Sequence, residues 1–305
     1  MTSICRYKLT SSIIFGLTVL ISSYSVSIWA SSTDEQVIVE QNKQQNNGGI
    51  IANLMVEHDT PFMLYPYDTN YLLVSYTSNM NKEPIATYEW ASHAQKVENK
   101  FQISLAFPIW RGIFTENSLL GASYTQRSWW QAYNHKDSSP FRDTNYEPQL
   151  FLAWLTDWQF AGWTIQEVEF GLNHQSNGRS ENTSRSWNRG YMRISAVNGN
   201  WLIDIKPWFR FNESRQNDDN PDMIKYMGHY RAKIGYKAGE SIFSIDGHYN
   251  WRSGYGGVEA GWSYPLTKHV RFYSQVFSGY GESMIDYNQK QDIRVGAGFM
   301  LNDLF

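Results

Sequence analysis

The residues best suited to chemistry lie between positions 169 and 191 of the 305-residue chain. His174 and Ser176 stand two residues apart, and Asn188 follows a loop rich in Ser, Asn, Gly and Arg. Side chains two apart on a strand project from the same face, so a base and a hydroxyl can meet there. An antiparallel return strand would bring Asn188 back beside His174. The three residues then supply a nucleophile, a general base and an amide that orients the base, which is the arrangement of an activated serine.

The first thirty residues indicate export. Arg6 and Lys8 precede an apolar run at residues 13–21, and the small residue Ala30 follows it. This pattern predicts a signal peptide over residues 1–30, because the apolar run is too short to span a bilayer as an anchor. We expect residues 31–66 to form a periplasmic N-terminal segment. The single cysteine, Cys5, precedes the apolar run, so the mature chain has no disulfide framework.

Composition narrows the class of protein. Aromatic residues make up 16% of the chain, with 13 Trp and 20 Tyr, yet the mean hydropathy is −0.50. The formal net charge of −3 provides no basic excess for nucleic acid. No apolar run after the signal approaches the 18 residues of a transmembrane helix. A chain that is rich in aromatic residues but has a low mean hydropathy is typical of a membrane β-barrel with aromatic girdles.

Apolar and polar residues alternate along segment after segment from residue 70 onward. Phe101, Ile103 and Leu105 alternate with Gln102 and Ser104, and the same period recurs over residues 163–177, 201–211, 225–237 and 243–251. A soluble sandwich would show the same alternation, but segment length and aromatic ends favour a barrel in lipid. We count about twelve strands, which predicts a twelve-stranded antiparallel transmembrane β-barrel over residues 67–305.

The connections between these segments alternate in length. Short ones fall at residues 156–162, 197–200, 237–241 and 266–269, and longer polar ones fall at 131–145, 175–186, 212–222 and 281–291. Outer-membrane barrels have this alternation of short periplasmic turns and long external loops. The last predicted strand ends in Phe305, and a terminal aromatic residue is also typical of such barrels.

The side chains of His174, Ser176 and Asn188 fall on the lipid-facing side of the predicted barrel. His174 and Ser176 continue the phase of Phe170 and Leu172, and Asn188 shares the phase of the apolar residues of the return strand. Polar side chains facing lipid are costly unless they have a function. Substrates at that depth are lipids, so the inferred reaction is hydrolysis of phospholipid acyl esters. Oxyanion stabilisation would come from the backbone amides after Ser176 or from a bound cation, and the residues alone leave that choice open.

Several motifs resemble outer-membrane phospholipase A of Gram-negative bacteria, over residues 50–305. They are NHQSNGRS at 173–180, TSRSWNR at 183–189, YEPQLFLAW at 146–154, IKYMGHY at 224–230, YPLTKHVR at 264–271 and MLNDLF at 300–305. The resemblance implies an outer-membrane enzyme that hydrolyses phospholipids and lysophospholipids, depends on Ca²⁺ and is activated by dimerisation.

The resemblance also assigns roles to individual residues. Ser176 would be the nucleophile, His174 the base and Asn188 its orienter, with the Gly178 amide in the oxyanion hole. The residues implied to hold Ca²⁺ are Arg179 through its carbonyl, Ser184 through its hydroxyl and Ser138 of the partner subunit at the dimer site, and Asp219 at a second site.

A homodimer contact is expected at Gln126. This residue interrupts a lipid-facing stripe on residues 120–130, and an amide in hydrocarbon needs a polar partner. The resemblance supports a second copy of the chain as that partner, whereas a lipid headgroup is the alternative. Two rival functions remain at this point, a passive pore and a structural barrel without catalysis.

Overall fold

The computed structural model describes residues 49–56, 63–214, 216 and 218–302. These residues belong to one compact unit, residues 43–305. The predicted signal peptide, residues 1–30, and residues 31–48 of the predicted periplasmic segment lie outside the described residues.

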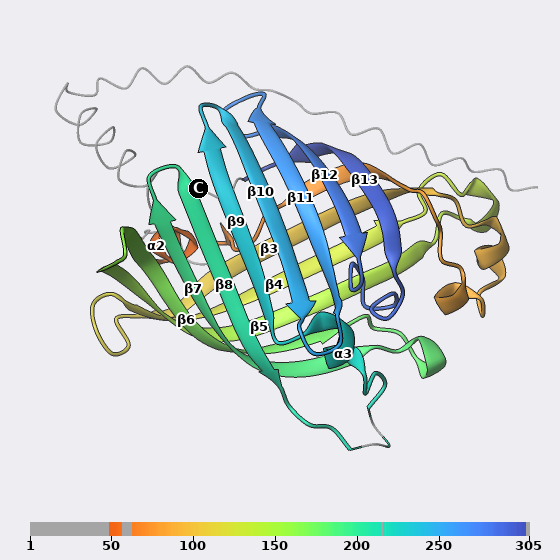
Figure 1. Ribbon diagram of the computed structural model, residues 1–305, viewed down its shortest axis with the longest axis horizontal. Helices are drawn as coiled ribbons and strands as arrows, with labels where there is room; N and C mark the ends of the chain where they lie inside the picture. The colour runs from red at the N-terminus through yellow and green to blue at the C-terminus, as the bar shows by residue number, and fades with distance from the viewer. Residues whose placement is uncertain (1–48, 57–62, 215, 217, 303–305) are drawn as a thin grey trace, which may run out of the picture. The chain divides into compact units, whose positions relative to one another are not determined.

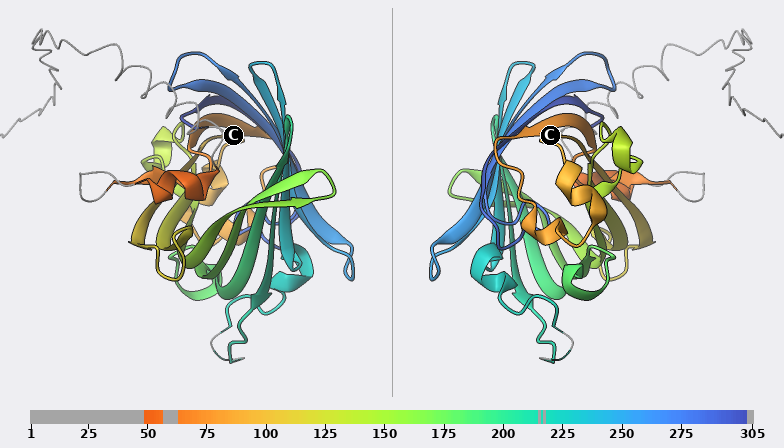
Figure 2. Two further views of the ribbon diagram at one scale, coloured as in Figure 1. Left: turned by 90° about the vertical axis from the view of Figure 1, so that its left-hand side faces the viewer. Right: turned by 90° about the vertical axis from the view of Figure 1, so that its right-hand side faces the viewer.

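Twelve antiparallel strands, β2 to β13, close into a ring (Figures 1 and 2). Each strand pairs with its neighbours in sequence, and β13 pairs with β2 to complete the circle. The predicted twelve-stranded antiparallel barrel is therefore confirmed. The strands are β1 (Tyr65–Pro66), β2 (Tyr71–Thr77), β3 (Val97–Arg111), β4 (Ser118–Trp130), β5 (Phe141–Phe160), β6 (Trp163–Ser176), β7 (Ser186–Asn198), β8 (Trp201–Arg210), β9 (Tyr230–Ala238), β10 (Ser241–Asn250), β11 (Tyr255–Pro265), β12 (Arg271–Gly279) and β13 (Gln291–Met300).

The short strand β1 lies beside β3 just beyond the end of β2, so it extends the same edge without adding a position to the ring. The helices are equally short: α2 (Ile50–Met55), α3 (Met223–Met227), η1 (Glu83–Ile85), η2 (Glu89–His93), η3 (His135–Asp137) and η4 (Glu181–Thr183). Within the described ranges, no helix has the length and apolarity needed to cross a membrane.

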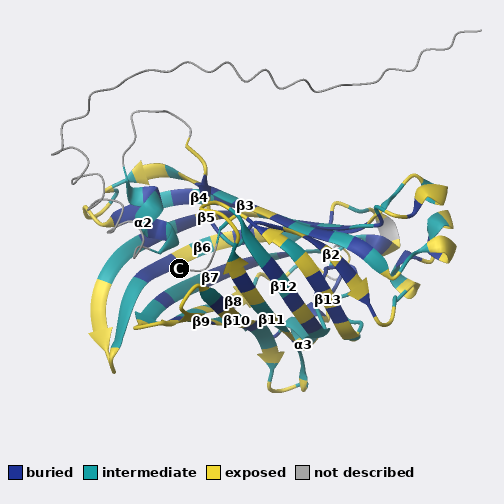
Figure 3. Ribbon diagram, turned by 90° about the horizontal axis from the view of Figure 1, so that it is seen from above, coloured by how far each residue is buried: buried dark blue, intermediate teal, exposed yellow. Residues whose placement is uncertain are grey.

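Buried and exposed residues alternate along the strands (Figure 3). On β6, Glu167, Glu169 and Asn173 are buried on the lumenal side, whereas Phe170 and Leu172 are exposed on the outside. This is the reverse of a soluble protein, in which the apolar face is the covered one. A closed sheet satisfies its backbone hydrogen bonds between strands, which is what lipid demands of a spanning structure.

The connections at the two ends of the barrel differ as the sequence predicts. Residues 161–162, 199–200 and 239–240 form tight turns at one end, and residues 131–140, 177–185, 211–229 and 280–290 form the longer loops at the other. Some predicted boundaries are wrong. The connections expected over 131–145 and 156–162 are shorter, because β5 extends from Phe141 to Phe160. The strand expected over 225–237 begins at Tyr230, because Met223–Met227 form α3 and Gly228 ends that helix with a positive φ of 65°.

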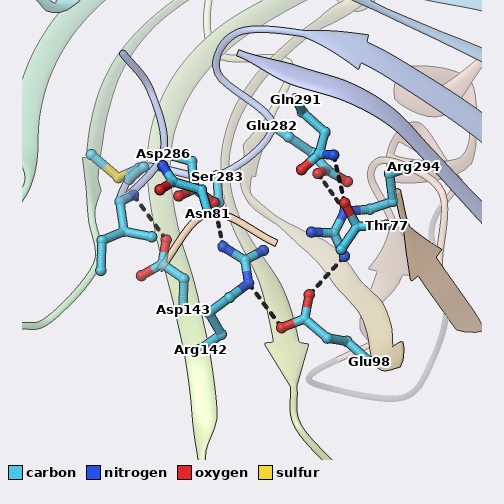
Figure 4. A network of polar contacts seen from close by, with 12 residues as sticks. Thr77, Asn81, Glu98, Arg142, Asp143, Glu282, Ser283, Asp286, Gln291 and Arg294 are labelled. Atoms are coloured by element: carbon cyan, nitrogen blue, oxygen red, sulfur yellow. Dashed lines mark hydrogen bonds and ion pairs between the residues drawn. The ribbon is translucent and has the colours of Figure 1, made fainter. Parts of the chain in front are cut away.

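Charged pairs lie inside the barrel near the longer loops (Figure 4). Glu98 binds Arg142 and Arg294, at 2.8 and 2.6 Å, and all three side chains are buried. Arg142 also contacts Asp286, which lies on the loop 280–290. Burying ions is favourable only when each finds close partners, and this network supplies them.

The helix α2 packs against the lumenal side of the barrel wall. Ile51 and Leu54 are fully buried in a cluster that includes Phe151, and the backbone amide of Ile51 donates to Glu167 Oε1 at 2.7 Å. Residues 49–56 of the predicted periplasmic segment are therefore part of the barrel core.

Candidate active site on the outer wall

The imidazole of His174 meets the amide of Asn188 on the outside of the barrel. These residues are direct partners in the β6–β7 ladder, and His174 Nδ1 lies 2.8 Å from Asn188 Oδ1. Asn188 is half-buried and His174 is exposed, in the same phase as Phe170 and Leu172. The structure thus brings together the base and orienter that the sequence predicts, on the predicted face.

Ser176 ends β6 on the same outer face, two residues beyond His174. Their Cα atoms are about 6.6 Å apart, given a rise of about 3.3 Å per residue along a strand. Ser176 pairs with Tyr146 of β5 on one side and with Ser186 of β7 on the other. The side chain of Ser176 is half-buried. A hydroxyl and an imidazole two residues apart on one face of a strand can approach each other.

The lumenal side of the same wall holds the pair in place. Gln175 Oε1 accepts a hydrogen bond from Trp187 Nε1 at 2.8 Å and a second one from Arg189 Nη2 at 3.2 Å. Both hydrogen bonds connect β6 to β7 next to the paired residues His174 and Asn188. Sequence reasoning assigned Gln175 no role, because its partners become neighbours only when the strands pair.

The loop that follows Ser176 is tied to itself through Asn177. The buried side chain of Asn177 accepts from the Arg185 amide at 2.9 Å and donates to the Thr183 carbonyl at 2.9 Å. Gly178 then adopts a left-handed φ of 63°, where an added Cβ would lie 3.0 Å from the Tyr146 ring. Glycine is the residue that this backbone conformation favours. The chain therefore turns sharply next to Ser176, where the predicted oxyanion donor stands.

The residues predicted to hold Ca²⁺ are only partly brought together. Ser184 Oγ donates to Asp219 Oδ2 at 2.5 Å, so the structure joins two side chains that the resemblance placed in separate sites. Ser138 lies on another loop, after η3, with a left-handed φ of 58°. Among the contacts of the described residues, none joins Ser138 to the other three.

The donor chemistry fits a hard cation. Hydroxyl, carboxylate and carbonyl oxygens are the ligands of Ca²⁺. The guanidinium of Arg179 is engaged elsewhere: it donates to the Arg142 carbonyl at 2.7 Å and lies over the Tyr88 ring at 4.9 Å. The positive charge of Arg179 therefore has partners of its own, the Arg142 carbonyl and the Tyr88 ring. Within the described part of the chain, no group of three or more His, Cys, Asp or Glu side chains is arranged so that it could hold a metal ion.

Gln126 lies on the outer face of β4 within a ladder of polar side chains. Tyr124 Oη donates to Gln126 Oε1 at 3.2 Å, and Gln126 Nε2 donates to Ser128 Oγ at 3.2 Å. The amide therefore has partners within its own strand. An amide group can make four hydrogen bonds, so these two leave capacity for a further partner.

Comparison with known proteins agrees with this geometry. The family model described as phospholipase A1 matches residues 50–301. A phospholipase A1 of Klebsiella pneumoniae is 63% identical over 264 residues, which cover 87% of this chain and 91% of that protein.

Two solved structures are similar over 85% of this chain and 99% of their own. The outer-membrane phospholipase of Salmonella typhi, a dimer with bound calcium, has a TM-score of 0.81 and 64% identity. An active-site variant of the outer-membrane phospholipase A of Escherichia coli, with an asparagine changed to alanine, has a TM-score of 0.82 and 64% identity. On this evidence the chain is a member of the outer-membrane phospholipase A family, the phospholipases A1 of the bacterial outer membrane.

Proposed function

We propose that this protein hydrolyses the acyl esters of phospholipids and lysophospholipids in the outer membrane, with Ser176, His174 and Asn188 as its catalytic triad. The observation that carries the proposal is the 2.8 Å contact between His174 Nδ1 and Asn188 Oδ1 on the outer face. This face meets lipid, so ester bonds at headgroup depth come to the site without leaving the bilayer.

The mechanism follows from the tautomer that this contact selects. A carbonyl oxygen accepts, so Asn188 Oδ1 requires a proton on Nδ1 and leaves Nε2 free as the base. His174 Nε2 takes the proton of Ser176 as its oxygen attacks the ester carbonyl. The same proton then passes to the departing lysophospholipid or glycerophospho alkoxide. Water, deprotonated by Nε2, releases the fatty acid from Ser176 in the second half of the reaction.

The developing oxyanion is stabilised by the Gly178 amide in this proposal. The left-handed φ of Gly178, two residues after Ser176, supports the assignment. Arg179, Ser184, Asp219 and the partner subunit's Ser138 would hold Ca²⁺. When bound, the ion would supply positive charge that stabilises the developing oxyanion. Association of two copies through Gln126 completes that set of ligands and makes activity depend on dimerisation.

The decisive assay measures release of fatty acid from phospholipid in mixed micelles by the refolded protein, with Ca²⁺ or with a chelator. We expect hydrolysis with Ca²⁺ and its loss with chelator. Ser176→Ala should abolish turnover, whereas Ser180→Ala, at an exposed serine of the following loop, should retain it. A wild-type protein inactive under both conditions would defeat the proposal, and so would an active Ser176→Ala variant.

A further inference from the structure

A carboxylate stands behind the amide that orients His174. Asn188 Nδ2 donates to Glu213 Oε1 at 3.4 Å, while Asn188 Oδ1 faces the imidazole at 2.8 Å. The Asn188 amide is thus held between the ring and a half-buried acidic side chain. Neither strand of the triad contributes Glu213, which lies in the loop after β8.

The backbone fixes this loop along the start of β7. The Phe211 amide donates to the Asn188 carbonyl at 2.8 Å, continuing the β7–β8 ladder one step beyond Arg210. Further along, the Ser186 amide donates to Asn220 Oδ1 at 2.9 Å. These contacts bracket Glu213, one through the main chain of Phe211 and the other through the side chain of Asn220, and they hold the loop beside the start of β7.

The chemistry of the three groups is directional. A carboxylate only accepts hydrogen bonds, so the amino end of the Asn188 amide must face Glu213. Its carbonyl end then faces His174 Nδ1, which must carry the proton. Without the carboxylate, the amide can turn over and present its amino group to Nδ1. That orientation favours a proton on Nε2, where the base is needed.

We propose that Glu213 is a positioning residue that fixes the orientation of the Asn188 amide and, through it, the tautomer of His174. This inference rests on the function proposed above and extends it from three residues to four. Glu213 does not touch the substrate; it acts through Asn188.

The test compares Glu213→Leu, which removes the acceptor, with Glu213→Gln, which retains an acceptor oxygen. We expect kcat to fall about fivefold to tenfold in Glu213→Leu with KM unchanged, the size expected for one lost hydrogen bond. Glu213→Gln should stay within about threefold of the wild type, on the same reasoning. Glu240→Leu, at an exposed glutamate in a turn at the other end of the barrel, is the matched control. Heat-modifiable gel migration checks that each variant is folded.

A second readout is independent of turnover. In protein labelled with ¹⁵N-histidine in micelles, the imidazole nitrogen shifts report the tautomer of His174, assigned with a His174→Asn variant. We expect the Nδ1–H form in the wild type and in Glu213→Gln, with the Nε2–H form growing in Glu213→Leu. An Nδ1–H tautomer unchanged in Glu213→Leu would overturn the role of Glu213, even with Ser176 confirmed as nucleophile. Failure of the proposed function would show itself separately, as an active Ser176→Ala.

Discussion

The side chain of His174 lies on the lipid-facing side of a wall whose lumenal side holds Gln175, Trp187 and Arg189. The adjacent residues His174 and Gln175 of β6 thus face two environments. His174 faces lipid on the outside of the barrel, and Gln175 belongs to a packed polar network on the inside. Since side chains alternate between the faces, a shift of one residue in register would exchange them. The cross-strand hydrogen bonds on the lumenal side hold that register where the catalytic pair needs it.

Removing the amide that orients His174 should reduce turnover without preventing binding. We expect Asn188→Ala to lower kcat about tenfold, since one hydrogen bond to the ring is lost and the imidazole can adopt either tautomer. KM should change little, because Asn188 contacts the ring and the Glu213 carboxylate. Steady-state kinetics on micellar phospholipid will measure both constants. A rise in KM at constant kcat would instead assign Asn188 to substrate binding.

At the scale of elements, the loop 177–185 carries the proposed oxyanion donor, Gly178, and two of the proposed Ca²⁺ ligands, Arg179 and Ser184. Its shape depends on one buried side chain, Asn177, which joins the two ends of the loop. Asn177 also lies 3.4 Å from Asp143 Oδ1 on β5, and Asp143 accepts from the Ile285 amide at 3.1 Å. The active-site loop and the loop 280–290 are therefore coupled through one buried carboxylate.

Asn177→Ala should loosen this loop. The substitution leaves the Arg185 amide and the Thr183 carbonyl without their partner, at a cost of about 1–3 kcal/mol for each buried group left unsatisfied. We expect weaker Ca²⁺ activation and faster hydrogen exchange over residues 177–185. Calcium titration of activity and exchange mass spectrometry will measure these effects. Asn182→Ala, at an exposed position of the same loop, is the control, and equal behaviour of the two variants would contradict the assigned role.

At the scale of the whole molecule, the barrel is filled at its loop end by ion pairs. Glu282 accepts from Lys100 Nζ at 3.1 Å and from Arg294 Nε at 2.7 Å, and all three are buried. A lumen packed in this way argues against the passive pore, since each ion is occupied by a protein partner. The network also ties the loop 280–290 to the strands.

This network predicts a loss of stability in acid. Burial alone would raise the pKa of Glu282, but the charges of Arg294 and Lys100 lower it to about 2. Because the folded protein binds this proton less readily than the unfolded chain, the stabilisation is complete above pH 5. It is lost as the pH falls from about 4.5 towards 2.

Urea unfolding in micelles will test this pH dependence. At pH 7 we expect Glu282→Gln to be less stable than the wild type by about 3 kcal/mol, the cost of leaving buried cations short of a partner. The difference should shrink as the pH falls towards 2. A difference that stays constant from pH 7 to pH 2 would contradict the ionic origin.

Dimerisation should depend on Gln126. We expect Gln126→Leu to lower the yield of crosslinked dimer in detergent with Ca²⁺, by roughly threefold to tenfold in association constant for one polar contact in a membrane. Gln159→Leu, at an exposed glutamine at the far end of β5, should dimerise like the wild type. An unchanged yield in Gln126→Leu would show that its bonds to Tyr124 and Ser128 are its whole role.

The sequence by itself determined the barrel and the face on which His174, Ser176 and Asn188 lie. Alternation has a period of two on any strand, so Phe170, Leu172, His174 and Ser176 could be assigned to one face before any strand was paired. The strand boundary at Tyr230 could not be predicted, because Lys225 and Tyr226 also fit the alternating pattern of the strand that follows. In the folded chain, residues 223–227 form a helix that packs against β10 and β11.

Only the tertiary structure decided which loop side chains contact Asn188 and Ser184. The contacts of Asn188 with Glu213 and of Ser184 with Asp219 join residues 25 and 35 positions apart, on either side of the turn between β7 and β8, and Glu213 and Asp219 lie in the loop after β8. Loop residues have no periodicity from which a direction can be inferred, and their partners depend on how the chain turns between strands. A strand's geometry is repeated at every residue, whereas a loop's geometry is set by the few contacts that anchor it.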